Sequence, residues 1–392
     1  MKVLIASSFA GSVGGVQSHV DTLRSALGRA GVESILVARS SITLADLADL
    51  ADMVKAMLMA GGRIDVGRAK FAEQATVRLR RKIERVARAP ATRPDLLHAH
   101  DALITADEVQ PRLPTVLTVH GPLSREVALA AEGGLPRPRY VAYIRKAEIR
   151  AYRAADALIA VDSGQKAIIV EDFGIPESKV TIVPNAVDTD IFSPRAVPPA
   201  AVPYLLVARR LVPKTGVHVA IRALALATSF QGELWIAGDG QERPGLQRLT
   251  RELGLEGRVR FLGTVGRAAM IDLIAGSRGS IIPSVPVGGV VEATSIAALE
   301  AMSMARPVWA SRIGGLADII SHGQNGFLFP AGDARSLADL LDRTAGDPAL
   351  LAAIGGAART HALEHHGTAA WAAQTLEVYE AALGSFRPAL RT

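Results

Sequence analysis

The chain has 392 residues, of which 49% are hydrophobic and 21% charged, and its formal net charge is +6. That length suffices for two or three domains, each with a hydrophobic core of its own. Cysteine is absent, which excludes disulfides, zinc–thiolate centres and a cysteine nucleophile. No apolar run in the sequence reaches the length that a bilayer-spanning helix needs.

Residues 1–9 combine one cation with a short apolar run, so a signal peptide is one interpretation of this start. A first β-strand is the preferred interpretation, because a glycine-rich turn at 11–15 and an amphipathic helix follow at once. Glycine lets a backbone approach a ligand closely, and a helix N-terminus favours an anion. A tight turn without a ligand is the alternative. The spacing also differs from that of dinucleotide-binding turns, which disfavours a dehydrogenase.

The segment 67–88 has the composition of a basic amphipathic helix. Its apolar face either packs on the domain core, with the cations solvated, or lies on an anionic membrane. Core packing is favoured, because this face has no Trp and a single Phe. The apolar positions are Phe71, Ala75, Leu79, Ile83 and Val86, and the basic ones are Arg78, Arg81, Lys82, Arg85 and Arg88.

Polar residues lie at the carboxyl ends of two predicted strands, 96–100 and 115–120. They are His98, His100 and Asp101 in one segment and His120 in the other. In open α/β sheets, ligands collect at this carboxyl edge of the strands. Three imidazoles and a carboxylate could suggest zinc, but they form no compact metal-binding spacing, so no metal is assigned. A histidine at a strand end is also commonly structural.

Strand-like apolar runs alternate with helical patterns along the whole chain, which predicts an α/β protein with parallel sheets. A proline-rich stretch at 192–203 separates two such series and suits an interdomain linker. The predicted domains are 1–195 and 204–367, joined by a linker at 196–203 and followed by a helical segment at 368–392. The predicted strands are 3–7, 34–38, 96–100, 115–120, 157–161, 180–184, 204–208, 233–237, 259–262, 280–283, 307–310 and 327–329.

In the second series, a basic turn follows the strand at 204–208 and contains Arg209, Arg210 and Lys214. Such a turn is commonly just solvated. Further on, Glu292 and Glu300 are separated by seven residues. Glu292 lies just before a helix predicted over 293–304, with Thr294 or Ser295 as its cap, and Glu300 lies further along that helix. The two carboxylates lie about 12 Å apart along the helix axis. That span suits the two ends of one elongated polar ligand, with the helix N-terminus between them attracting phosphate. A surface helix with two solvated glutamates is the alternative.

In combination and in order, these segments resemble the retaining glycosyltransferases of family four, whose fold is called GT-B. The resemblance extends from the turn at 11–15 to Gly314-Gly315 and Asn325-Gly326, and so covers nearly the whole chain. It implies an α/β fold with two doubly wound Rossmann-like domains facing across a cleft. It also implies that the helix within 368–392 crosses back to the first domain.

The resemblance implies a donor site for a nucleotide-diphospho-sugar. Glu292 would contact the sugar hydroxyls and Glu300 the ribose diol. The backbone between them, at Thr294, Ser295 and Ile296, would hold the diphosphate.

The family's Arg and Lys in the basic turn neutralise the leaving diphosphate. Arg210 matches the Arg, but Thr215 stands at the Lys position, with Lys214 one residue earlier. Arg209 replaces the usual Gly. Either Lys214 reaches the phosphate from a shifted position or Arg209 shares its role.

In the first domain, Gly14, Gly15 and His19 match the family's Gly-Gly-x-x-x-His turn, and the resemblance carries the approach to the donor sugar to His120. In the second domain, Gly238 matches a segment that lines the donor pocket. Leu262 lies in a further such segment, near the nucleobase. The Asp188-Thr-Asp190 motif resembles the family's segment before the linker, so it is interpreted as structural rather than as a metal site.

The chain is therefore predicted to be a retaining, metal-independent hexosyltransferase of carbohydrate or glycoconjugate biosynthesis. Its donor is a nucleotide-diphospho-sugar, with a UDP-sugar favoured, and its acceptor is a hydroxyl on a soluble or lipid-linked molecule. No cofactor, metal or nucleic-acid partner is expected. The expected location is the cytoplasm, with peripheral membrane contact through 67–88 as an option. A sugar-nucleotide epimerase of the same fold and a non-catalytic nucleotide-sugar-binding protein are the alternatives.

Overall fold

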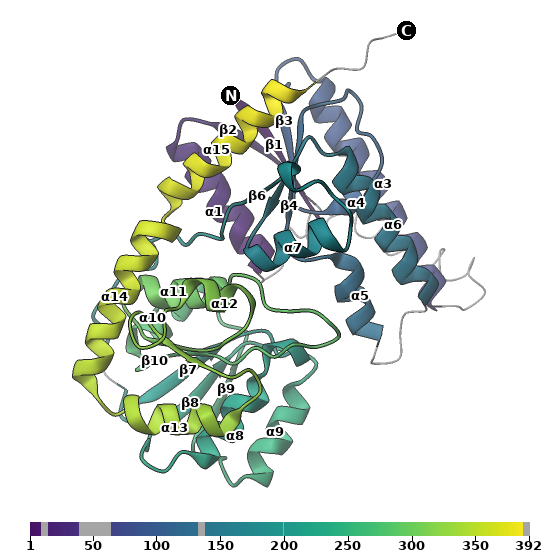
Figure 1. Ribbon diagram of the computed structural model, residues 1–392. Coiled ribbons are helices and arrows are strands. Elements are labelled where there is room, and N and C mark those ends of the chain that lie inside the picture. Colours follow the sequence, from purple (N-terminus) through teal and green to yellow (C-terminus); the bar gives the residue numbers. More distant parts are fainter. Residues whose placement is uncertain (9–14, 39–63, 132–137, 199, 387–392) are drawn as a thin grey trace. The chain divides into compact units, whose positions relative to one another are not determined.

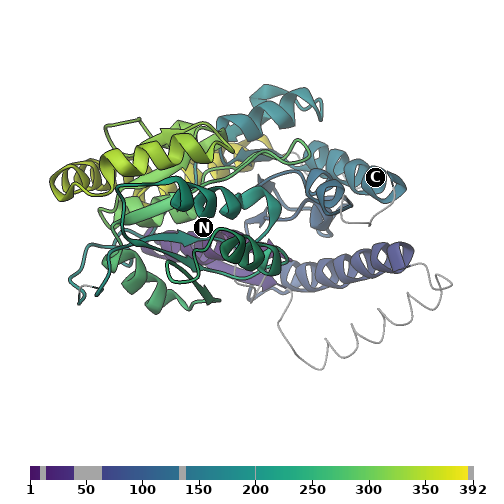
Figure 2. The ribbon, with the colours of Figure 1, turned by 90° about the horizontal axis from the view of Figure 1, so that it is seen from below.

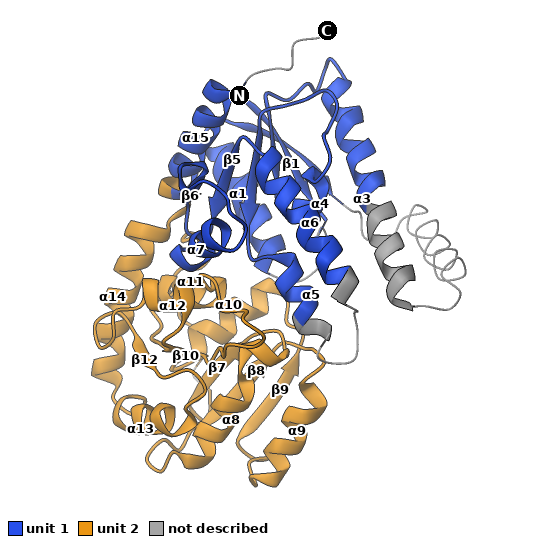
Figure 3. Cartoon of the chain, turned by 45° about the vertical axis from the view of Figure 1, so that its right-hand side comes forward, with its two compact units in different colours: residues 1–184, 371–392 blue, residues 185–370 orange. Residues whose placement is uncertain are grey.

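The computed structural model describes residues 1–8, 15–38, 64–131, 138–198 and 200–386 (Figure 1). Its internal contacts divide the chain into two units. Unit 1 comprises Met1–Pro184 and Trp371–Thr392, and unit 2 comprises Asn185–Ala370 (Figure 3). No described helix is long and apolar enough to cross a membrane.

Unit 1 is built on a parallel six-stranded sheet with the order β2-β1-β3-β4-β5-β6. Its strands are β1 (Lys2–Ser7), β2 (Glu33–Ala38), β3 (Leu96–Ala99), β4 (Thr115–Val119), β5 (Ala157–Ala160) and β6 (Val180–Ile182). Its helices are α1 (Gly15–Arg29), α3 (Ile64–Arg88), α4 (Ala102–Thr105), α5 (Leu123–Ala131), α6 (Pro138–Ala154), α7 (Ser163–Glu171) and most of α15 (Thr368–Ser385).

Unit 2 has a second parallel six-stranded sheet, with the order β12-β11-β10-β7-β8-β9. Its strands are β7 (Tyr204–Ala208), β8 (Glu233–Ala237), β9 (Val259–Gly263), β10 (Gly279–Ile282), β11 (Val308–Ser311) and β12 (Phe327–Phe329). Its helices are α8 (Val217–Leu226), α9 (Arg243–Glu252), α10 (Arg267–Gly276), α11 (Ile296–Ser303), α12 (Gly314–Ile319), α13 (Ala334–Thr344) and α14 (Pro348–His366).

Both faces of the unit 2 sheet are buried, as the apolar runs in its strands require. Successive side chains of a strand point to opposite faces. Leu205 and Val207 of β7 therefore belong to one core cluster, and Leu206 belongs to another. Helices cover both faces, which is the arrangement that parallel sheets need. All twelve predicted strands are present, with ends that differ from the prediction by a residue or two.

The C-terminal half of α3 packs on the core of unit 1, as the favoured interpretation of 67–88 predicts. Leu79 and Ile83 are buried in one cluster with Leu4 of β1. Figure 2 shows the later residues of this long blue-violet helix beside the purple strands of unit 1. Phe71 and Ala75 lie outside the residues whose side chains are described.

The proline-rich stretch predicted as a linker packs against unit 2. Its Val197 and Ala200 contact an apolar core cluster of that unit. The division between the units falls earlier in the chain, after Pro184. Proline density indicates an extended backbone here, but apolar side chains between prolines can still bind a core.

Each sheet has one point at which the strand order reverses. In unit 1 it lies between β1 and β3, and in unit 2 between β7 and β10. Ligands of open α/β sheets bind beyond the carboxyl ends of the strands at this switch point. The candidate residues follow these strands or lie on neighbouring elements in both units.

Candidate active site

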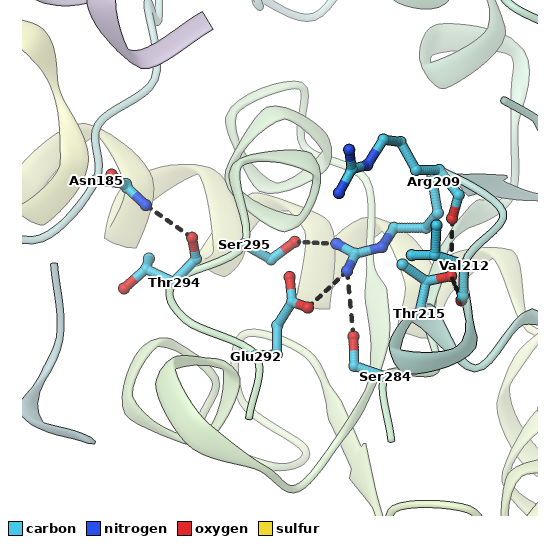
Figure 4. A network of polar contacts seen from close by, with 9 residues as sticks. Asn185, Arg209, Val212, Thr215, Ser284, Glu292, Thr294 and Ser295 are labelled. Atoms are coloured by element: carbon cyan, nitrogen blue, oxygen red, sulfur yellow. Dashed lines mark hydrogen bonds and ion pairs between the residues drawn. The ribbon is translucent and has the colours of Figure 1, made fainter. Parts of the chain in front are cut away.

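Arg209 is the centre of a buried polar network at the switch point of unit 2 (Figure 4). It directly follows β7, and its guanidinium donates from Nη2 to Glu292 Oε2 at 2.7 Å and from Nη1 to Ser295 Oγ at 2.9 Å. Nη2 also lies 3.3 Å from the hydroxyl oxygen of Ser284, just beyond β10. The Arg209 and Glu292 side chains are only 10% and 13% exposed. Arg209 thus fixes one Glu292 carboxylate oxygen and the Ser295 hydroxyl in a single arrangement.

Helix α11 begins at Ile296, three residues later than predicted. Ser295 occupies the predicted N-cap position, but its side chain makes no capping hydrogen bond. Its oxygen accepts from Arg209 instead. The N–H groups of the first turn of α11 are therefore not capped by Ser295. Such a terminus, with its positive dipole end, is suited to an anion.

Gly314 and Gly315 hold the segment before α11 in place. A Cβ on Gly315 would lie 2.5 Å from the Thr294 nitrogen, and one on Gly314 would lie 2.0 Å from the Glu292 carbonyl oxygen. The Gly315 N–H donates to that same carbonyl at 3.2 Å. On the other side, Asn185 Nδ2 donates to the Thr294 carbonyl at 2.9 Å. Only glycine allows this approach of the backbone at 314–315.

The basic turn after β7 is closed by Thr215, which stands where the family has Lys. Its buried hydroxyl donates to the carbonyls of Arg210 and Val212, at 2.8 and 2.7 Å (Figure 4). Arg210 is exposed and Lys214 half-buried. Arg209 is engaged with Glu292, so Arg210 is the most exposed cation of this turn. The departure at 215 therefore has a structural reason, namely closure of the turn.

Gly238 and Leu262 lie near each other at the ends of β8 and β9. The Gly238 N–H donates to the Gly263 carbonyl at 2.7 Å, next to the exposed Leu262. A Cβ on Gly238 would lie 1.9 Å from the Arg209 carbonyl oxygen. Backbone contacts thus link the two predicted donor-pocket segments to the Arg209 turn.

Glu300 lies one helical turn further along α11 and is half-buried. Burial raises its pKa to about 7, against the smaller opposing effect of Arg267. Its carboxyl therefore titrates near neutral pH. Perturbed carboxyls of this kind are enriched at functional sites.

In unit 1 the predicted His120 lies in a cluster of imidazoles. His100 Nδ1 and His120 Nε2 are 3.2 Å apart, and the ring of His19 from α1 lies edge-on to His120, with ring centroids 4.5 Å apart. Burial, followed by the charges of neighbouring imidazoles, holds the pKa of His100 and His120 well below the usual range. His98 is hydrogen-bonded at both nitrogens, to Thr118 Oγ1 at 2.7 Å and to the Tyr379 hydroxyl at 2.6 Å.

Three further predicted positions are Gly14, Gly15 and Asp188. Gly14 lies outside the described residues, and Gly15 is the first residue of α1. Asp188 is buried, and its Oδ1 accepts from the backbone N–H groups of Asp190 and Ile191, both at 3.2 Å. This carboxylate closes its own turn, in line with the structural interpretation.

Sequence reasoning did not find Ser284, Asn185 or Glu148. The buried Glu148 of α6 accepts from the N–H groups of Leu123 and Ser124, at the start of α5 and shortly after His120. Burial raises its pKa. Its partners are more than twenty residues away in sequence, so no local pattern marks it.

Comparison with known proteins defines the class to which this fold and site belong. The family model "Glycosyltransferase Family 4" matches residues 13–191, and "Glycosyl transferases group 1" matches residues 189–361. A D-inositol 3-phosphate glycosyltransferase of Kineococcus radiotolerans is 30% identical, over 95% of this chain and 92% of the relative. The chain belongs to the family-four glycosyltransferases, as the sequence motifs predict.

Other relatives match over a smaller part of their length. A D-inositol 3-phosphate glycosyltransferase of Streptomyces avermitilis is 31% identical over 71% of this chain and 62% of the relative. The chain thus spans less than two thirds of that relative. An MMP alpha-(1->4)-mannosyltransferase of Mycolicibacterium hassiacum is 29% identical over 69% of this chain and 66% of the relative.

Solved structures show the same fold. Sucrose-phosphate synthase from Thermosynechococcus elongatus has a TM-score of 0.76 at 20% identity, covering 98% of this chain and all of that one. Anabaena HepE in complex with UDP-glucose has a TM-score of 0.70 at 20% identity, covering 97% of this chain and 99% of that one. The fold is GT-B, as predicted.

Proposed function

We propose that the chain is a retaining, metal-independent hexosyltransferase that uses a nucleotide-diphospho-sugar donor, with a UDP-sugar favoured. The observation that carries this proposal is the Arg209–Glu292–Ser295 network beside the N-terminus of α11. It combines an oriented carboxylate with an anion site at the switch point of a Rossmann-like sheet. Solved structures of the same fold, Anabaena HepE among them, hold UDP or UDP-glucose, which supports the choice of uridine.

The diphosphate lies at the start of α11 in this proposal. Breaking the glycosidic bond develops negative charge on the β-phosphate oxygen. Arg210 and Lys214, together with the first-turn N–H groups of α11, stabilise that charge without a metal. A preorganised donor in such a site contributes about 3 kcal/mol to transition-state stabilisation.

Glu292 orients the sugar through its hydroxyls and does not attack it. Its Oε2 is 2.7 Å from the Arg209 guanidinium, a charge-assisted bond that withdraws electron density from the carboxylate. A retaining hydrolase instead uses a free carboxylate nucleophile about 5 Å from a second carboxyl group. We therefore propose retention from the family resemblance. In this mechanism the donor's own leaving group takes part, and no carboxylate nucleophile is needed.

The remaining donor contacts follow the family positions. Glu300 accepts hydrogen bonds from the ribose diol, and Leu262 supplies an exposed apolar surface for the base. Gly238 lets the backbone come close to the donor. In unit 1, His120 contacts the donor sugar, and the backbone at Gly14 and Gly15 contacts the donor.

The favoured acceptor is a hydroxyl group on a soluble molecule. The alternative acceptor is a hydroxyl group on a lipid-linked molecule. Leu79 and Ile83 are buried, so the apolar face of α3 that they share is not available to a bilayer. Arg81, Lys82, Arg85 and Arg88 remain exposed and can still bind anionic headgroups. If the acceptor is lipid-linked, we propose that these cations make peripheral contact at the inner face of the cytoplasmic membrane.

The test combines a nucleotide screen with product analysis. A nucleoside diphosphate at a hundred times its Kd should add about 2.7 kcal/mol to the free energy of unfolding. Glu292→Gln should keep nucleotide binding but lose sugar transfer by roughly two orders of magnitude. Because it also removes the charge partner of Arg209, the stabilisation by nucleotide is measured against the variant's own Tm without ligand. Turnover of the nucleotide-sugar without an acceptor would indicate an epimerase. Binding without any turnover, across a panel of hydroxyl acceptors, would indicate a binding protein.

A further inference from the structure

Three imidazoles from separate elements converge at the switch point of unit 1. His19 comes from α1, His100 follows β3, and His120 follows β4. One ring nitrogen of each lies within 4.8 Å of the others. His19 and His100 are buried to 3% and 4% exposure. From this convergence we infer that the His19–His100–His120 cluster is a binding site for a divalent transition metal ion of the zinc type.

The spacing of the rings suits one ion. Zinc–imidazole bonds are about 2.0–2.1 Å long, so two nitrogens near the tetrahedral angle lie about 3.4 Å apart. His100 Nδ1 and His120 Nε2 are 3.2 Å apart. The centroid of the His19 ring lies 4.5 Å from that of His120 and 5.2 Å from that of His100, so a third imidazole adjoins this pair.

Within the part of the chain that the structure describes, one ring nitrogen of this cluster has no hydrogen-bond partner. His100 Nε2 is buried and has no hydrogen-bond partner. A buried polar atom without a partner costs about 1–3 kcal/mol. Nδ1 of this ring is the nitrogen that faces His120, so Nε2 would carry the N–H of a metal-bound His100 and is not itself a ligand.

Neighbouring residues hold two of the rings in place. The His98 ring lies 4.3 Å from the His100 ring and is fixed by its bonds to Thr118 and Tyr379. The Trp371 ring lies 4.8 Å from the His19 ring. His98 is excluded as a ligand because both of its nitrogens are engaged. Packing of this kind fixes the orientation of metal-binding imidazoles.

The ligand set selects the ion. Three neutral nitrogen ligands and no carboxylate suit Zn²⁺, Co²⁺, Ni²⁺ or Cu²⁺ better than Mg²⁺ or Ca²⁺. The nearby Asp101 carboxylate already accepts from the Leu103 N–H at 2.8 Å and caps α4. The described residues thus supply three ligands and leave one position open to water or another small ligand, as in open zinc sites.

One consequence rests on the proposed function. His120 is the proposed contact of the donor sugar, so an ion and the sugar compete for the same imidazole. Micromolar Zn²⁺ should inhibit sugar transfer, a chelator should restore it, and His19→Gln should make transfer less sensitive to Zn²⁺.

The binding test does not depend on activity. The full chain, freed of metal with a chelator, is titrated with Co²⁺ and followed by visible absorption, with calorimetry for Zn²⁺. The wild type should bind one ion per chain in the triad. His19→Gln and His100→Gln should each weaken binding about 100-fold or more, with circular dichroism and Tm reporting their folding.

The matched control is the surface histidine pair on α14, His361 and His365, whose ring centroids are 4.7 Å apart. His361→Ala/His365→Ala should leave the triad's binding unchanged. In the Co²⁺-loaded wild type, NMR should show three hyperfine-shifted imidazole N–H signals. This measurement uses the wild type alone, so it does not depend on whether the variants fold. The inference is wrong if the wild type binds no Co²⁺, or if both triad variants bind Co²⁺ as tightly as the wild type.

Discussion

At the residue scale, one departure of the chain from the family motif is Arg209, which stands where a glycine is usual. Its guanidinium bonds Glu292 and Ser295, residues 83 and 86 positions away. The sequence left open whether Arg209 shares the diphosphate role. Arg209 bonds the Glu292 carboxylate in the structure, and Arg210 and Lys214 are the phosphate contacts in the proposal.

Glu300 makes donor binding depend on pH near neutrality. Burial raises its pKa to about 7, and hydrogen bonds from a ribose diol favour the ionised carboxylate. Donor affinity should therefore rise about tenfold between pH 6 and pH 8, since the ionised fraction rises by that factor. Calorimetric titration with the nucleoside diphosphate measures it, with Glu300→Gln as the control that should show a flat profile. A wild-type profile as flat as the variant's would remove Glu300 from the ribose site.

The raised pKa of Glu300 also makes the free energy of unfolding depend on pH. Donor affinity rises with pH, whereas this contribution to stability falls. The folded pKa lies above the ordinary value of 4.5, so the folded chain holds this proton more tightly. Glu300's contribution to stability is therefore greatest below pH 4.5 and is lost as the pH rises to about 7. Glu300→Gln should accordingly be more stable than wild type at pH 8, by about 1–3 kcal/mol in chemical denaturation.

Arg210 is expected to act in the transition state. Arg210→Ala should lower kcat by ten- to a hundredfold with a smaller change in KM, because the charge it neutralises grows during bond cleavage. Lys214→Ala should behave likewise if Lys214 reaches the phosphate. Steady-state kinetics test both, with the exposed Arg248→Ala on α9 as a matched loss of charge. Wild-type kinetics in Arg210→Ala would contradict the proposed diphosphate site.

At the element scale, the strands were predictable and the start of α11 was not. Parallel strands buried on both faces are continuous apolar runs, so their positions follow from the sequence alone. The start of α11 depends on which group forms a hydrogen bond with the Ser295 hydroxyl. It bonds Arg209 rather than its own helix, a long-range contact that no local capping pattern reveals.

The Gly314-Gly315 turn of α12 should be required for the geometry of the donor site. A Cβ at 315 would lie 2.5 Å from the Thr294 nitrogen, so Gly315→Ala should displace the segment before α11. We expect a loss of about 1–3 kcal/mol in stability and weaker binding of the nucleoside diphosphate. Gly356→Ala is the matched control. It lies in α14 with no atom within 4 Å of its added Cβ, so it should be neutral or stabilising. Equal effects of the two substitutions on Tm and nucleotide affinity would contradict this role.

The exposed cations of α3 give a salt-dependent prediction. Arg81 and Arg85 are exposed while Leu79 and Ile83 are buried, so contact with anionic liposomes should be electrostatic only. Any co-sedimentation at low salt should be lost at physiological ionic strength, where the screening length is about 8 Å. Zwitterionic liposomes are the control. Retention at physiological salt would favour the lipid-linked acceptor.

At the scale of the whole molecule, the family and fold could be predicted from motifs in order along the chain. What could not be predicted are contacts between distant segments. His19 lies against Trp371 and His98 against Tyr379, so the last helix helps to build the histidine cluster of unit 1. The packing of the proline-rich stretch on the unit 2 core likewise depends on residues far along the chain.

The central claim is metal-independent transfer with retention, and NMR of the sugar product tests it most directly. The full chain is incubated in excess chelator with an α-linked UDP-hexose and a panel of hydroxyl acceptors, and the anomeric signal of the new glycosidic bond is recorded. We expect an α-linked product, formed at the same rate as without the chelator. A β-linked product, or transfer that stops in chelator and returns on adding Mg²⁺, would contradict it.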